Sequence, residues 1–140
     1  MDINNILYFM GLVKIQKAVI KKDDKYLIGF RSTNSKYFPL HWDFPGGKLE
    51  SNEDPFDGIV REVKEETDLD IKPLKAIGVY EFDLDNKGEN THCFTIYSTE
   101  TISGEVKLSD EHLEQRWATK DEILKLKIEP YFEPFFNEHL

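Results

Sequence analysis

A single cysteine, Cys93, is all that the 140 residues contain, so no disulfide can form within the chain. We therefore expect a protein of a reducing compartment, the cytoplasm, with Cys93 as a small buried residue of a strand. The chain also lacks any run near the roughly 20 apolar residues that a membrane-spanning helix needs. Basic residues are scarce, because 18 Lys and Arg stand against 27 Asp and Glu, for a formal net charge of −9. Binding to a nucleic-acid backbone needs a basic face, so we expect neither a nucleic acid nor a membrane as partner.

The length and the apolar content indicate what the chain can form. With 140 residues, 39% hydrophobic and 13% aromatic, it is expected to fold as one globular domain over residues 1–140. Residues 6–13 are apolar, but Asp2 and the missing basic segment do not fit a signal peptide. We expect these residues to pack on the core or on a second copy of the chain, as a homodimer.

Runs rich in β-branched and aromatic residues, separated by turn signals, predict a mixture of strands and helices. The expected strands are 12–20, 26–31, 41–44, 76–84, 91–101, 105–108 and 117–118. The first two are expected to form a hairpin, Pro73 to interrupt the chain before the strand at 76–84, and residues 109–116 to form a loop. A capping box from Thr119 to Glu122 predicts a short helix, and the aromatic tail 130–140 predicts a packed terminal helix.

The longest helix is expected just after the Gly46-Gly47 turn. Asp54 can cap it, and Pro55 suits its first turn, where the missing N–H costs nothing. Apolar residues then recur at positions i, i+3, i+4 and i+7, and this spacing predicts one buried stripe. The stripe consists of Phe56, Ile59, Val60 and Val63.

Three carboxylates are spaced on a different face of the same helix. Glu62, Glu65 and Glu66 fall at i, i+3 and i+4, where each like-charged pair costs an isolated helix about 0.2–0.5 kcal/mol. Hard divalent cations bind through oxygen ligands and would turn that repulsion into attraction. The spacing therefore favours a site for Mg²⁺ or Mn²⁺.

Residues 47–69 resemble the Nudix box, G-x5-E-x7-R-E-U-x-E-E-x-G-U, in which U is a bulky aliphatic residue. The matching positions are Gly47, Glu53, Arg61, Glu62, Val63, Glu65, Glu66 and Leu69. Asp68 stands where the family has glycine, at a position near the helix end that often needs φ > 0. The resemblance implies a single Nudix hydrolase domain with an α/β fold, an α/β/α sandwich with a mixed β-sheet.

The resemblance also implies roles for individual residues. It makes Glu62 and Glu66 the main metal ligands, with Glu65 and the carbonyl of Gly46 as further ligands. Arg61 would orient the glutamates through charge-assisted hydrogen bonds, and Glu53 would lie in the outer shell. Glu111 is our choice for a general base or extra ligand from a loop before Trp117, ahead of Glu114 and then His112. Arg31 and Lys48 are the expected phosphate contacts, and Tyr37, Phe38, Tyr80, Phe82 and Phe94 are candidates for stacking on a base.

Family members hydrolyse a nucleoside diphosphate linked to another moiety, so a nucleotide is the expected partner. The run Trp42–Glu50 resembles that of enzymes acting on (d)NTPs, which favours a nucleotide pyrophosphatase. ADP-ribose, nucleotide sugars and dinucleoside polyphosphates stay open as substrates. A non-catalytic module that senses a nucleotide is a separate alternative, although it has no need of clustered ligands. An isopentenyl diphosphate isomerase shares the fold, but Cys93 follows the box, on the wrong side of it for that family.

Overall fold

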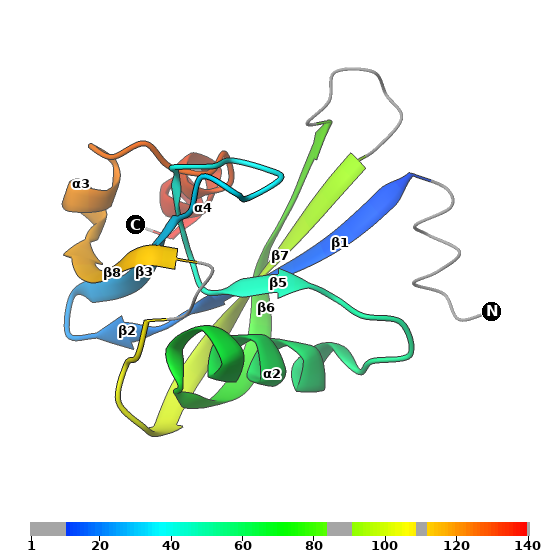
Figure 1. The fold of residues 1–140 in the computed structure, drawn as a ribbon, viewed down its shortest axis with the longest axis horizontal. Helices are drawn as coiled ribbons and strands as arrows, with labels where there is room; N and C mark the ends of the chain where they lie inside the picture. Colours follow the sequence, from blue (N-terminus) through cyan, green and yellow to red (C-terminus); the bar gives the residue numbers. More distant parts are fainter. Residues whose placement is uncertain (1–10, 84–90, 109–111, 140) are drawn as a thin grey trace.

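The computed structural model describes residues 11–83, 91–108 and 112–139 (Figure 1). Its strands are β1 (Leu12–Val19), β2 (Lys21–Lys22), β3 (Lys25–Arg31), β4 (Trp42–Asp43), β5 (Gly46–Lys48), β6 (Asp70–Asp83), β7 (Thr91–Ser103) and β8 (His112–Thr119). Its helices are α2 (Pro55–Thr67), α3 (Lys120–Ile123) and α4 (Phe132–Glu138). No helix among these residues is long and apolar enough to cross a membrane.

The larger sheet has the strand order β5-β1-β7-β6 and lies between two helices (Figure 1). It is mixed, because β1 and β7 run parallel while β5 and β6 pair antiparallel at either side. Alternating residues of β7 point to opposite faces. Phe94 and Ile96 join the cluster that contains α4, whereas Tyr97 joins the cluster under α2. The expected α/β/α sandwich with a mixed sheet is confirmed.

The smaller sheet is antiparallel and is centred on β3. Strand β8 pairs with β3 along most of its length, and β2 and β4 also pair with β3. The expected hairpin between residues 12–20 and 26–31 forms only next to its turn, where β2 pairs with β3 and the N–H of Leu27 donates to the carbonyl of Ile20 at 2.9 Å. The rest of that prediction is wrong, since β1 pairs with β5 and β7 instead. The partner of β1 comes from far along the chain, and local pattern carries no information about it.

Three further expectations about strands are wrong. Pro73 lies inside β6, where the pairing with β7 shifts register between Pro73 and Lys75. Because β6 is an edge strand, a residue without an N–H is tolerated there. Residues 105–108 form no strand, and Lys107 instead donates its backbone N–H to the carbonyl of Thr67. Residues 112–116, expected in a loop, belong to β8.

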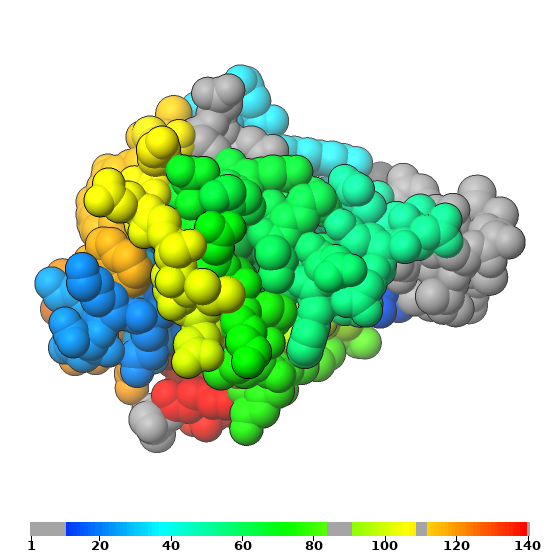
Figure 2. Space-filling model, turned by 90° about the horizontal axis from the view of Figure 1, so that it is seen from below, coloured from blue at the N-terminus to red at the C-terminus, as the bar shows by residue number. Residues whose placement is uncertain are grey.

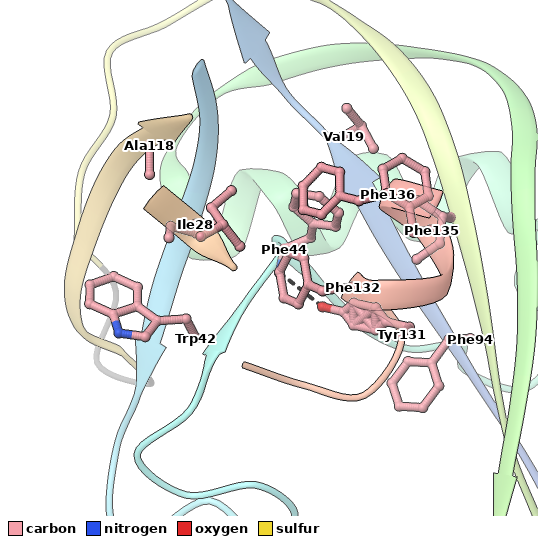
Figure 3. Packing of buried hydrophobic residues seen from close by; sticks show 12 residues of the cluster. Val19, Ile28, Trp42, Phe44, Phe94, Ala118, Tyr131, Phe132, Phe135 and Phe136 are labelled. Atoms are coloured by element: carbon pink, nitrogen blue, oxygen red, sulfur yellow. Dashed lines mark hydrogen bonds between the residues drawn. The ribbon is translucent and has the colours of Figure 1, made fainter. Parts of the chain in front are cut away.

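An aromatic core lies between the two sheets and α4 (Figure 3). Phe44 and Tyr131 are completely buried, and the backbone N–H of Phe44 donates to the Tyr131 hydroxyl at 2.9 Å. The expected packed terminal helix and the capping box at Thr119 are confirmed. This core anchors the segment before the glycine turn, because β4 and Phe44 lead directly into Pro45.

Candidate active site

Helix α2 begins as the sequence predicts, but its buried face differs from the expected stripe. The Asp54 carboxylate accepts hydrogen bonds from the N–H groups of Phe56 and Asp57, at 3.0 and 3.2 Å. Phe56 is 42% exposed and lies edge-on to Tyr97. The buried residues of α2 are Gly58, Ile59, Val63, Glu66 and Thr67. The stripe is thus wrong at Phe56, and the buried face includes a carboxylate.

The Gly46-Gly47 turn holds two of the helix carboxylates. The N–H of Gly46 donates to Glu66 Oε2 at 2.8 Å, and Glu66 is only 4% exposed. Gly46 has φ +148°, and a Cβ there would overlap the carbonyl oxygen of Gln16. A Cβ on Gly47 would lie 2.6 Å from Glu62 Oε2. The N–H of Gly46 therefore holds the carboxylate of Glu66, and the missing side chain of Gly47 leaves room for the carboxylate of Glu62 beside the turn.

Arg61 gathers the remaining carboxylates of the Nudix-like stretch. Its guanidinium donates twice to Glu53, from Nε at 2.7 Å and from Nη2 at 3.0 Å. It also lies 3.1 Å from Glu62 Oε1 and 3.2 Å from Glu65 Oε2. The hydrogen bond from Arg61 lowers the pKa of Glu53. The Glu65 side chain is 59% exposed. Figure 2 shows the green segment that contains α2 on the surface of the molecule seen from below.

The residues around the turn can hold a divalent cation, although they do not form a complete cage. Among the described residues, no three His, Cys, Asp or Glu side chains lie close enough together to hold a metal ion. Mg²⁺ commonly uses one or two protein carboxylates and completes its octahedron with water and substrate phosphate. The all-oxygen pair of Glu62 and Glu66 suits that requirement. Burial and the nearby Asp43 raise the pKa of Glu66 well above its ordinary value, a cost that a bound cation would offset.

A buried cluster of charges beside Glu66 was not foreseen from the sequence. Asp43 lies at its centre and is completely buried. Its Oδ2 accepts from Lys17 Nζ at 3.0 Å and from Arg31 Nη1 at 2.9 Å, and its Oδ1 lies 3.1 Å from His112 Nε2. Despite burial, Lys17, His112 and Arg31 keep the pKa of Asp43 well below its usual range. The carboxylate is therefore ionised, and His112 donates to it from Nε2.

Glu129 is the second carboxylate of this cluster. Its Oε2 lies 3.5 Å from Arg31 Nε, and its Oε1 lies 3.8 Å from Lys17 Nζ. Oε1 accepts no hydrogen bond from any described residue, although Glu129 is only 3% exposed. Burial raises the pKa of Glu129 to about 7, against the opposing effect of Lys17. One sequence signal could have found the cluster, because Lys17 falls in register with the core-facing Ile15 and Val19.

A pocket of about 190 Å³ is lined by Glu129 and by both glycines of the turn. Its lining includes both residues expected to contact phosphate, Arg31 and Lys48. The rest of the lining is Val13, Ile15, Lys17, Tyr37, Phe38, Gly46, Gly47, His92, Phe94 and Glu129. Of the five aromatic candidates for stacking, Tyr37, Phe38 and Phe94 line this pocket. Tyr80 instead donates to Glu138 at 2.7 Å, and Phe82 packs edge-on against Phe94.

The three candidates for the loop acid have different outcomes. Glu111 lies outside the described residues. Glu114 is on the surface, paired with Arg116 at 2.8 Å, and Arg116 in turn lies over the Trp42 ring. His112 is buried against Asp43. The sequence reading missed Gln115, whose Nε2 donates to the carbonyl of Glu66 at 2.8 Å and ties β8 to the end of α2.

Comparisons with known proteins agree with this geometry. A family model described as the NUDIX domain matches residues 17–138. The chain is 34% identical to an ADP-ribose pyrophosphatase of Methanocaldococcus jannaschii over 122 residues, which are 86% of this chain and 69% of that one. It is 24% identical to a CTP pyrophosphohydrolase of Escherichia coli, with 86% of each chain covered. The crystal structure of a MutT protein from Methanosarcina mazei superposes with a TM-score of 0.79 at 30% identity, covering 91% of this chain and 95% of that one.

Proposed function

The chain belongs to the Nudix hydrolase family, whose members cleave nucleoside diphosphate derivatives, and we propose that it hydrolyses nucleoside triphosphates, ribo or deoxy, to the monophosphate and pyrophosphate. One observation carries the proposal. Gly46 and Gly47 line the pocket and also hold the carboxylates of Glu66 and Glu62. A nucleoside in the pocket would therefore direct its phosphates along the turn toward these carboxylates.

The size and lining of the pocket support a substrate with a single base. A volume of about 190 Å³ is below the roughly 300 Å³ at which pockets for drug-sized ligands begin. It has room for one ring system, and Tyr37, Phe38 and Phe94 offer aromatic and apolar surface for it. Glu129 adds an acidic group to the same lining, and Arg31 and Lys48 are the proposed phosphate contacts. A second nucleoside would have to lie outside this pocket.

Glu62 and Glu66 are the proposed metal ligands, with Glu65 and the carbonyl of Gly46 as further ligands. A bound Mg²⁺ or Mn²⁺ would neutralise phosphate charge and acidify water. Arg61 holds Glu53, Glu62 and Glu65 in place, and Arg31 and Lys48 bind the substrate. Glu111 is the proposed general base or additional ligand.

ADP-ribose is the second candidate substrate. The Methanocaldococcus jannaschii relative, 34% identical over most of this chain, is an ADP-ribose pyrophosphatase. Hydrolysis of ADP-ribose would release AMP and ribose phosphate, whereas hydrolysis of a nucleoside triphosphate releases a monophosphate and pyrophosphate. Product identity therefore separates the two candidates.

The test is a substrate panel in millimolar Mg²⁺, with products separated by ion-exchange chromatography. The panel contains the common (d)NTPs, ADP-ribose, a nucleotide sugar and a dinucleoside tetraphosphate. We expect pyrophosphate and a monophosphate from at least one (d)NTP, with the highest kcat/KM of the panel. If ADP-ribose is the better substrate, the second candidate replaces the first. If nucleotides bind but none is cleaved, the protein is a nucleotide sensor.

Paired variants in the same assay test the loop acid. Glu111→Gln should reduce turnover strongly, whereas Glu114→Gln serves as its matched control because the Glu114 side chain pairs with Arg116 on the surface. Reduced turnover in Glu114→Gln alone would move the role to that residue. Unchanged turnover in both variants would exclude the loop as the source of the base.

A further inference from the structure

Lys17 is a lysine whose side chain is buried in the protein. It lies in the middle of β1 with its side chain 2% exposed, and its Nζ is 3.0 Å from Asp43 and 3.8 Å from Glu129 Oε1. Burial by itself lowers the pKa of Lys17, but the carboxylates of Asp43, Glu129 and Glu66 outweigh it and raise that pKa. Lys17 is therefore a cation in the lining of the pocket.

The two carboxylates that Lys17 contacts are not equally dependent on it. Asp43 has two other partners, since Arg31 lies 2.9 Å and His112 3.1 Å from its oxygens. Glu129 has Arg31 3.5 Å from its Oε2 and interacts with Tyr131, but among the described residues its Oε1 has the ion pair with Lys17 and no hydrogen bond. A buried acceptor without a donor costs free energy unless a ligand supplies one. Glu129 lines the pocket, and among the described residues Lys17 is the cation that pairs with its open oxygen.

We propose that Lys17 is a positioning residue that presents Glu129 Oε1 to the substrate and so sets the affinity and the base preference of the pocket. Lys17 acts through Glu129 and contacts no reacting atom. The group that Glu129 then selects is a hydrogen-bond donor, such as the exocyclic amine of cytosine, adenine or guanine. Uracil and thymine lack that amine. This inference rests on the proposed function, because it takes the pocket to hold the base.

The experiment compares Lys17→Met, Glu129→Gln and the double variant in the full chain. Binding of the four nucleoside monophosphates AMP, CMP, GMP and UMP is measured by calorimetry without metal, and KM and kcat are measured on the best substrate. Lys14→Met is the matched control, a lysine of the same strand outside the pocket lining. Circular dichroism establishes that each variant is folded before binding is measured.

We expect Lys17→Met to weaken binding of an amine-bearing monophosphate by roughly tenfold or more, the usual effect of losing a hydrogen bond to a charged group. UMP, which has no exocyclic amine and offers only its ring N3–H, should lose less affinity, and KM should rise more than kcat falls. Glu129→Gln should have a similar effect, and the double variant should be no worse than Glu129→Gln alone. Lys14→Met should bind like the wild type.

Three results would overturn the proposal. Unchanged monophosphate binding in folded Lys17→Met, with only its melting temperature lowered, would make Lys17 structural. Additive effects in the double variant would mean that Lys17 contacts the substrate directly. An equal loss for UMP and the other monophosphates would remove the base preference. If Lys17→Met does not fold, Lys17→Arg keeps the charge, and the proposal then requires a rise in KM from its displaced head group.

These readouts separate this proposal from the proposed function. Monophosphate binding needs neither metal nor turnover, so it can be measured even if the panel shows no hydrolysis. Binding that depends on Lys17 without any hydrolysis would reject the enzyme and retain the positioning role. Hydrolysis, together with monophosphate binding that does not depend on Lys17, would retain the proposed enzyme and reject the positioning role.

Discussion

Some side chains of this site reduce the stability of the fold but are proposed to serve its function. Glu66 is nearly inaccessible to solvent and accepts the N–H of Gly46, yet it lies close to the ionised Asp43. The Glu129 carboxyl group is also buried near Asp43. Buried charges of one sign without full compensation destabilise a fold, so their presence indicates a role in binding or chemistry.

Glu66→Gln should separate the effect on stability from the effect on function. The amide keeps an oxygen for the Gly46 N–H and removes a buried charge, so the metal-free variant should be no less stable than the wild type in urea denaturation. Turnover should fall by about two orders of magnitude or more, since lost electrostatic stabilisation of a transition state typically costs about 3 kcal/mol. Glu66→Ala is the control that loses the hydrogen bond and should also lose stability. A destabilised glutamine variant with near-normal turnover would make Glu66 structural.

Glu129 should make stability depend on pH. Its folded pKa of about 7 is above the ordinary 4.5, so the native state binds this proton more tightly than the unfolded state does. Stability from this group is therefore full below about pH 4.5 and is lost as the pH rises toward 7, by up to about 3 kcal/mol. Lys17, Arg31, Asp43 and Tyr131 surround the group and keep their charge states in that interval.

Glu129→Gln removes this titration and supplies the measurement. The free energy of unfolding of the variant, relative to wild type, should rise by about 1–3 kcal/mol between pH 5 and pH 8. Taking the difference cancels the titrations that both proteins share. A constant difference across this interval would mean that Glu129 titrates normally.

At the scale of elements, the end of α2 shows a local conflict between residue type and backbone. Asp68 caps the helix in the left-handed region with φ 64°, where the family pattern has glycine. Lys64 and Lys107 lie 3.5 and 3.6 Å from its carboxylate, but exposed pairs of this kind contribute little. The strain is therefore only weakly offset, and the sequence reading anticipated it from the departure alone.

Asp68→Gly should relieve that strain. We expect the free energy of unfolding to increase by about 0.5–1 kcal/mol, with the loss of two surface ion pairs as a minor opposing effect. Asp68→Asn is the matched control, because it removes the charge but keeps a side chain at the same φ. If the free energy of unfolding increases as much in the asparagine variant as in the glycine variant, then the negative charge of Asp68, and not backbone strain, destabilises the wild type.

For the whole molecule, a metal bound to the folded site should stabilise the entire domain. At ten times its dissociation constant, Mg²⁺ adds about 1.4 kcal/mol, which for a domain of this size raises Tm by about 3–6 °C. Differential scanning fluorimetry with and without EDTA measures the change. The Glu62→Gln/Glu66→Gln double variant should show no rise. An equal rise in that variant would place the metal elsewhere.

Features that depend on residues close in the sequence were predicted, whereas features that depend on residues far apart in the sequence were missed. The cap at Asp54, the capping box at Thr119 and the expected strands that formed followed from local residue patterns. The partners of β1, the passage of β6 through Pro73 and the exposure of Phe56 are set by tertiary pairing. The glutamates of α2 were found by spacing, and only folding shows that Glu66 is buried.

The cluster of Lys17, Asp43 and Glu129 marks the limit most clearly. Its members come from β1, β4 and the segment before α4, and each taken alone resembles a surface charge. The alternation of Lys17 with core-facing residues indicates from the sequence that its side chain is buried. The strand pattern does not predict which carboxylates form ion pairs with it.

The two adjacent glycines of the turn also differ in how evolution can treat them. At Gly46 a methyl group would meet the main-chain oxygen of Gln16 in the neighbouring strand, and no second substitution moves that oxygen aside. At Gly47 the obstacle is the tip of the Glu62 side chain, and shortening Glu62 to Asp would withdraw it. A screen for folded protein should therefore yield suppressors for Gly47→Ala and none for Gly46→Ala. The first position is fixed by the backbone, and the second is fixed by Glu62, a proposed metal ligand whose shortening would restore folding without restoring turnover.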